Sequence, residues 1–152
     1  MFRLLLVVLL PAFALATEGI VPCSNGAPMP NKVHVDNCEK VPCILPRGDH
    51  LTSIIDFESP SYSETLTLKN TWREIASGLT GEFPFPSSIK NACNHLLNAA
   101  CPVYPSEDIS YNLTMPVLKL YPPKLDLDLQ ISVWNDDGEA AFCFNILART
   151  SS

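Results

Sequence analysis

Three observations in the sequence predict an all-β fold, a sandwich of antiparallel sheets. Residues 121–134, YPPKLDLDLQISVW, alternate apolar and polar side chains, which is the pattern of a half-buried strand. The 14 prolines, about twice the usual share of residues, lie between apolar segments and separate them. No long segment has the 3.6-residue apolar period of a helix.

The expected strands are apolar segments that end at turn residues. They cover residues 32–36, 51–58, 64–69, 72–76, 109–115, 117–121, 124–134 and 140–147. The apolar face of the strand at 124–134 consists of Leu125, Leu127, Leu129, Ile131 and Val133. Residues 135–138, Asn-Asp-Asp-Gly, predict a hairpin between the last two strands. A short helical turn is expected over residues 89–97.

The chain is expected to consist of a leader, residues 1–16, and one domain, residues 17–152. Arg3 precedes an apolar run at residues 4–10, and Ala14-Leu15-Ala16 has the small-x-small form of a cleavage site, so the leader is predicted to be a secretory signal peptide. The run is too short for a bilayer and is broken by Pro11, which disfavours a membrane anchor. Cleavage would leave 136 residues, 152 less 16, enough to bury a core in a soluble protein.

The charge balance excludes several classes of partner. After loss of Arg3 the chain has 9 basic and 16 acidic residues, a net charge of −7 with neutral histidines. An acidic protein of this kind is not expected to bind nucleic acid or an anionic membrane surface. The charges are scattered, as on the solvated surface of a monomer.

The six cysteines predict three disulfides, because thiols on the secretory route are oxidised. Spacing narrows the possible pairings: Cys38 and Cys43 enclose four residues, and Cys93 and Cys101 enclose seven, as in clips around turns. Cys23 and Cys143 remain, and this pair would join the start of the mature chain to its last strand. The spacings do not form Cys-x-x-Cys pairs, so neither a zinc site nor another metal site is expected.

Catalytic patterns are missing, and the chain is not expected to be an enzyme or to need a cofactor. The histidines at 34, 50 and 95 are isolated, and neither Gly-x-Ser-x-Gly nor His-Glu-x-x-His occurs. Asp126 and Asp128 share a strand face, where solvated charges are the ordinary interpretation. The tripeptide Arg47-Gly48-Asp49 matches an integrin-binding sequence, but a glycine turn explains it equally well.

Residues 112–114, Asn-Leu-Thr, form a glycosylation sequon in a chain expected to be secreted. Strand alternation places Asn112 and Thr114 on the outward face, opposite Tyr111, Leu113 and Met115. Asn112 is therefore predicted to carry a glycan.

Bulky apolar residues beside prolines distinguish this chain, and core filling alone would explain them. Together with the cysteines, however, they resemble the Niemann-Pick type C2 protein family, the MD-2-related lipid-recognition group, over essentially the whole mature chain. The matching segments are Val35-Asp36-Asn37-Cys38, Pro42-Cys43-Ile44-Leu45-Pro46-Arg47-Gly48, Phe83-Pro84-Phe85-Pro86 seven residues before Cys93, Cys101-Pro102, Tyr111 with Met115-Pro116-Val117, and Cys143 in the last strand.

The resemblance implies an immunoglobulin-like β-sandwich with three disulfides and an apolar cavity between its sheets. It also implies that a sterol or another lipid is bound there and carried, without catalysis, in a secreted or lysosomal protein. By motif position, the ligand-binding residues would be Phe85, Val117 and Tyr121. A membrane-protein acceptor of the Niemann-Pick type C1 kind is a possible partner under this resemblance.

Two alternatives remain open. The same cavity could serve an extracellular lipid-sensing or semiochemical-carrier module in immunity or chemical signalling, and a secreted hydrolase has little support. Alternation that turns Val117 and Tyr121 inward also turns Lys119 inward, unless the strand bends after Pro116. If the strand does not bend, Lys119 would lie at the cavity mouth, and a fatty acid or another anionic lipid would become a candidate ligand.

Overall fold

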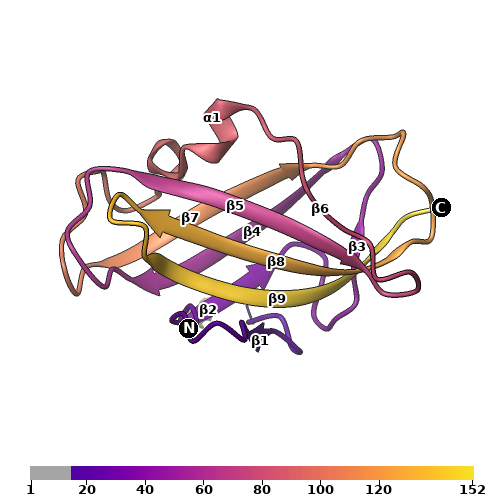
Figure 1. The fold of residues 1–152 in the computed structure, drawn as a ribbon, viewed down its shortest axis with the longest axis horizontal. Coiled ribbons are helices and arrows are strands. Elements are labelled where there is room, and N and C mark those ends of the chain that lie inside the picture. The colour runs from indigo at the N-terminus through magenta and orange to yellow at the C-terminus, as the bar shows by residue number, and fades with distance from the viewer. Residues whose placement is uncertain (1–14) are drawn as a thin grey trace, which may run out of the picture.

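A computed structural model describes residues 15–152 and arranges them as two facing β-sheets, which confirms the predicted sandwich (Figure 1). The leader lies outside the described residues except for its last two positions. The smaller sheet has the order β2-β4-β7, formed by Lys32–Val35, His50–Glu58 and Asp108–Pro116. All of its pairings are antiparallel.

The larger sheet has the order β1-β9-β8-β5-β6, with β3 pairing with β9 off this path. Its strands are β1 (Val21–Pro22), β3 (Cys43–Leu45), β5 (Leu66–Glu74), β6 (Thr80–Glu82), β8 (Asp126–Asn135) and β9 (Ala140–Thr150). β3 runs parallel to β9, and the other pairings in this sheet are antiparallel. Helix α1 (Ser87–Lys90) and the 3-10 turn η1 (Ala92–His95) lie between β6 and β7 in the chain.

Strand β8 has the alternation that the sequence predicts. Leu127, Leu129, Ile131 and Val133 are buried, while Leu125 lies just before the strand and is half-buried. The predicted hairpin joins β8 to β9, and its turn contains Gly138 with φ of +79°. The Asn135 side chain accepts hydrogen bonds from the backbone N–H groups of Asp137 and Glu139, which closes the turn.

Several predicted element boundaries are wrong. Residues 64–69 and 72–76 do not form two strands, because Asn70 and Thr71 continue the pairing with β8 and unite the segments as β5. Residues 117–121 form no strand, since the pairing of β7 with β4 ends at Pro116. The strands β1, β3 and β6 were not predicted, because segments of two or three residues are too short to show alternation.

Three disulfides cross-link the sandwich. They join Cys23 to Cys143, Cys38 to Cys43, and Cys93 to Cys101, with Cα atoms 5.7, 5.4 and 5.7 Å apart. The first links the segment after β1 to the first half of β9 across 120 positions of sequence, whereas the other two close short loops.

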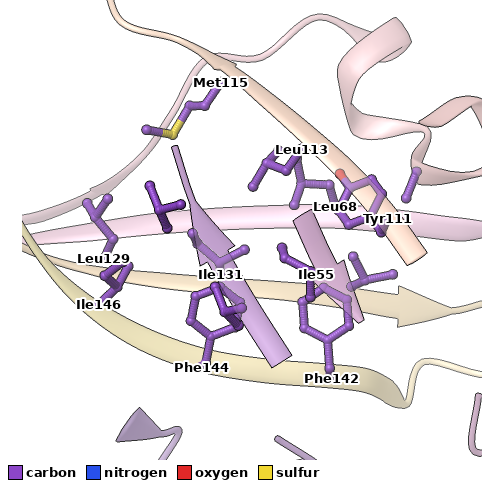
Figure 2. Packing of buried hydrophobic residues seen from close by; sticks show 14 of the residues in the cluster. Ile55, Leu68, Tyr111, Leu113, Met115, Leu129, Ile131, Phe142, Phe144 and Ile146 are labelled. Carbon is purple, nitrogen blue, oxygen red and sulfur yellow. The ribbon is translucent and has the colours of Figure 1, made fainter. Parts of the chain in front are cut away.

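The core lies between the two sheets (Figure 2). Ile55, Leu113 and Met115 come from the smaller sheet, and Leu129, Ile131, Phe142, Phe144 and Ile146 come from the larger one. The ring centroids of Phe57 and Phe142 are 4.9 Å apart across the sheets. Within residues 15–152, no helix is long and apolar enough to cross a membrane.

Candidate functional site

A cavity of about 450 Å³ opens at the end of the sandwich where β5 and β9 end and β8 begins. This is the end that holds the C-terminus in Figure 1. We call it the mouth cavity, and its walls are Leu45, Trp72, Glu74, Phe83, Tyr121, Pro122, Leu125, Leu127 and Thr150. Most of these side chains are apolar, and Glu74 is the single carboxylate among them.

The mouth cavity stops where the core becomes close-packed. Leu127 and Leu45 line the cavity, and the next inward positions on the same strands, Leu129 and Cys43, line a void of only about 10 Å³. Met115 of the smaller sheet borders this void from the opposite side. A void of this size barely admits one water molecule, so the cavity has a closed apolar floor in this conformation.

The outer wall of the mouth cavity belongs to the loop at residues 117–125, which follows β7. Its first part is held by the turn at residues 47–49: the Val117 N–H donates to the Asp49 carbonyl at 2.8 Å, and the Val117 carbonyl accepts from the Gly48 N–H at 2.7 Å. Gly48 has φ of +82°, which favours glycine in this turn. Arg47 completes the attachment, because its Nη2 donates to the Lys119 carbonyl at 2.8 Å.

The last part of the loop is held by Thr150 at the end of β9. The Thr150 Oγ1 donates to the Pro122 carbonyl at 2.6 Å and accepts from the Leu125 N–H at 2.8 Å. The Lys124 N–H donates to the Thr150 carbonyl at 3.0 Å. Tyr121 therefore lies on a loop that is attached at both ends, which positions its ring over the cavity.

Lys119 does not lie at the cavity mouth as alternation would place it. It is exposed, in a turn, and its aliphatic stem lies against Gly48. The reason is the end of β7 at Pro116: without strand pairing the two-residue period stops, and the side chains of the loop follow the turn instead. The expected inward lysine, which favoured an anionic lipid, is therefore not found at the cavity mouth.

The three predicted ligand-binding residues lie at different depths around the cavity. Tyr121 lines it and is half-buried, and burial raises the pKa of its phenol. Phe85 is buried behind Phe83, with their rings stacked at 5.6 Å between centroids. Val117 is 2% exposed at the base of the loop and is not among the residues that line the mouth cavity.

Phe83 and Trp72 are wall residues that the sequence did not indicate. Trp72 could have been found, because it continues the inward positions of β5 that begin at Leu66. Phe83 carries no signal that separates it from Phe85, since each is a phenylalanine followed by proline.

A second hollow, the edge cavity, has a volume of about 370 Å³ and lies along β5. Its lining residues are Thr67, Leu68, Lys69, Asn70, Glu82, Phe83, Phe85, Lys90 and Trp134. Phe83 lines both cavities, so this residue lies between them. Lys69 and Glu82 form an ion pair at 3.8 Å on the exposed side.

The residues that line the mouth cavity include no histidine, cysteine or serine. The three histidines lie apart on β2, β4 and η1, and each has its own local partner: Asp36, Asp49 and the Ser88 carbonyl. In the part of the chain from residue 15 onward, no group of three or more His, Cys, Asp or Glu side chains could hold a metal ion. The mouth cavity is therefore a mostly apolar site whose polar groups are the Tyr121 phenol, the Glu74 carboxylate and the Thr150 hydroxyl.

Comparisons with known proteins identify the family of this chain. The model of the ML domain family matches residues 19–150. A curated relative from Drosophila melanogaster, NPC intracellular cholesterol transporter 2 homolog a, is 29% identical over 120 residues, 78% of this chain and 77% of the relative. The ecdysteroid-regulated 16 kDa protein of Manduca sexta is 31% identical over 108 residues, 70% of this chain and 69% of the relative.

The fold also matches a solved structure. The crystal structure of a Niemann-Pick type C2 protein from the Japanese carpenter ant superposes with a TM-score of 0.73 over 88% of this chain and 99% of that chain. The two sequences are 16% identical. The similarity at this level concerns the sandwich architecture.

Proposed function

The chain belongs to the ML domain family, and on that premise we propose that it binds a sterol or another apolar lipid in the mouth cavity and carries it between membranes. The observation that supports this most directly is the mouth cavity itself, whose walls are mostly aromatic and aliphatic side chains and whose floor is the close-packed core. Its volume falls within the usual range for small-molecule sites. The Drosophila relative, by its name a cholesterol transporter, makes sterol the first candidate ligand.

The size of the cavity is sufficient for useful affinity. Burial of roughly 300 Å² of apolar ligand surface would contribute about 7 kcal/mol, before the cost of ordering ligand and protein is subtracted. No covalent step is needed, and the proposed activity is reversible binding without catalysis. A larger ligand would have to displace side chains at the closed floor around Leu129 and Met115.

Tyr121 and Phe83 are proposed to contact the ligand, because they form adjoining parts of the cavity wall. Phe85 and Val117 remain predicted members of the ligand-binding set. Phe85 supports the Phe83 ring from behind, and Val117 anchors the loop that presents Tyr121.

We also propose that the protein acts in a secreted or lysosomal compartment, as a monomer. Three disulfides suit an oxidising route. The first residue after the predicted cleavage site, Thr17, is buried, and its Oγ1 donates to the Cys38 carbonyl at 2.8 Å. The residue before that site, Ala16, is exposed. A membrane-protein acceptor of the Niemann-Pick type C1 kind would fit such a carrier.

Glycosylation of Asn112 is a further part of the proposal. Asn112 and Thr114 lie on the outer face of β7 and are half-exposed, which leaves room for a glycan outside the core. Mass spectrometry of protein secreted from insect cells should show a hexose-containing adduct on this residue. The adduct should be lost in Thr114→Val, which keeps the shape of the side chain but destroys the sequon.

The main experiment identifies what the protein carries. Protein purified from the medium of secreting cells would be extracted with organic solvent, and the lipids identified by mass spectrometry. The same protein would then be tested for transfer of a fluorescent sterol between donor and acceptor vesicles. We expect a stoichiometric lipid and faster transfer; failure of both would refute the carrier function. Transfer that requires a receptor would favour a lipid-sensing module.

A further inference from the structure

Asn70 is a polar side chain inside an otherwise apolar part of the sandwich. It occupies an inward position of β5 between Leu68 and Trp72, and it is 4% exposed. Its Nδ2 donates to the Met115 sulfur of the opposite sheet at 3.1 Å. Its Oδ1 is buried without any hydrogen-bond partner. The side chain is therefore only half-satisfied.

A buried amide oxygen without a donor is costly, because the group has lost its water and gained nothing in exchange. The thioether of Met115 is itself a weak acceptor, so the bond from Nδ2 offsets little of this cost. Leucine has nearly the same shape and would fill the position without an unpaired atom. An apolar residue at this position is therefore expected to make the fold more stable.

Asn70 lies at the wall of the edge cavity, with its Oδ1 buried behind the surface of that cavity. Asn70 lines the edge cavity together with Leu68, Phe83 and Phe85. Its backbone carbonyl accepts from the Phe83 N–H at 3.1 Å, so Asn70 is attached to the residue that separates the two cavities. Its neighbour Trp72, two positions along β5, already lines the mouth cavity. A lipid that displaces the Phe83 ring would pass from one cavity to the other.

We infer that Asn70 determines ligand specificity: its Oδ1 accepts a hydrogen bond from a hydroxyl group of the bound lipid, with the apolar body of that lipid against Phe83 and Phe85. This inference rests on the proposed carrier function and specifies its ligand class. An amide oxygen requires a donor. An alcohol supplies one, whereas an ester, an ether or a hydrocarbon does not, and a carboxylate offers only acceptors.

The two lysines that line the edge cavity do not favour an anionic lipid over a lipid alcohol. Lys69 and Lys90 are exposed, and Lys69 is already paired with Glu82. They could hold an anion at the surface, but an anionic head group placed beside the Asn70 oxygen would be repelled. A lipid alcohol is thus the class that the buried part of the edge cavity accepts.

The test compares two probes of equal size: a fluorescent sterol with a free hydroxyl group and its methyl ether. The protein would be produced in the bacterial periplasm, where disulfides form and N-glycans do not. We expect the wild type to bind the alcohol at least tenfold more tightly than the ether. In Asn70→Leu the affinity for the alcohol should fall about tenfold, that for the ether should stay the same, and the melting temperature should rise.

Asn112→Leu is the matched control. Asn112 also has a buried Oδ1 without a partner, but it lies on the outer face of β7 and lines neither cavity. This variant should keep the wild-type preference for the alcohol. The preference of the wild type for the alcohol over the ether is a test in its own right, because it does not depend on any variant folding correctly.

Equal binding of the two probes by the wild type would overturn the inference, as would an unchanged preference in Asn70→Leu. Tighter binding of a fatty acid than of the sterol alcohol would overturn it too. The ether cannot donate a hydrogen bond to Asn70, so its binding to the wild type depends on the apolar cavity alone. Ether binding therefore tests the carrier function separately from the role of Asn70. If the wild type binds neither probe, the carrier function fails and the inference fails with it.

Discussion

The ring of Phe83 meets the ring of Tyr121 edge to face, with centroids 6.1 Å apart and planes at 65°. Phe83 follows β6, and Tyr121 lies on the loop after β7, so the pair joins the two sheets at the rim of the mouth cavity. An apolar ligand in the cavity would touch both rings. Removal of the half-buried Tyr121 ring should therefore reduce binding without opening the core, whereas Phe83 is itself a core residue.

Tyr121→Ala should weaken sterol binding about tenfold, which corresponds to about 1.4 kcal/mol. The reason is the loss of an aromatic wall that excludes water from the ligand. Equilibrium binding of a fluorescent sterol measures this change. Tyr104→Ala is the control, because Tyr104 is 57% exposed and lines neither cavity. Equal losses in the two variants would remove Tyr121 from the site.

Val117→Phe should reduce the free energy of unfolding by about 1 to 3 kcal/mol. Val117 is 2% exposed, and its backbone is hydrogen-bonded to Gly48 and Asp49, so an added ring has little space. Urea unfolding and sterol binding would be measured on the same preparation. A variant with normal stability and tenfold weaker binding would instead place Val117 on the cavity wall, where the family resemblance puts it.

Tyr111→Phe should raise the free energy of unfolding by about 1 kcal/mol, because it removes a buried hydroxyl without a partner. Burial in the core raises the pKa of the Tyr111 phenol well above its ordinary value. Urea unfolding would be compared with that of Tyr62→Phe, whose hydroxyl is at the surface and should matter little. A clear loss of stability in Tyr111→Phe would mean that the hydroxyl has a partner.

The disulfides should differ in what they contribute. Loss of Cys23–Cys143, by paired replacement with alanine, should cost about 5 kcal/mol in the chain-entropy model, whereas loss of Cys38–Cys43 should cost about 2 kcal/mol. The reason is the separation of the bonded residues, 120 positions in the first pair and 5 in the second. Thermal unfolding of the two double variants measures the difference. Equal losses would show that loop length does not determine the effect.

The ion pair between β8 and β9 predicts a pH effect. The Asp126 carboxylate accepts from Arg149 Nε at 2.7 Å and Nη2 at 2.9 Å, and this hydrogen bonding lowers the pKa of Asp126 below its ordinary value. The stabilisation is present above the unfolded pKa of Asp126 and is lost as the pH falls through the lower, folded pKa.

Arg149→Gln should therefore raise the pKa of Asp126 toward its ordinary value, and the stability difference from wild type should vanish in acid. Carboxyl chemical shifts recorded by NMR against pH would measure the pKa. Arg73→Gln is the control, because Arg73 contacts Asp128 rather than Asp126. An unchanged Asp126 pKa in Arg149→Gln would rule out the pair as its cause.

Local pattern was enough to predict the sandwich, the hairpin at residues 135–138 and the strand β8, because inward and outward positions alternate along a paired strand. The cysteine and proline contexts were enough to indicate the family, which the match to the ML domain model confirms. The short strands β1 and β3 escaped prediction, since they exist only because β9 offers an edge to pair with.

The site depended on tertiary structure. Alternation placed Lys119 at the cavity, but the end of β7 at Pro116 released the loop, and contacts with Gly48 and Arg47 then turned that side chain to solvent. Phe83 and Asn70 acquire their roles from groups far away in the sequence: the ring of Tyr121 and the sulfur of Met115. A sequence determines which residues can pair and which faces are apolar. Which side chains meet around a cavity is decided only when distant segments pack, because each contact depends on the position of both partners.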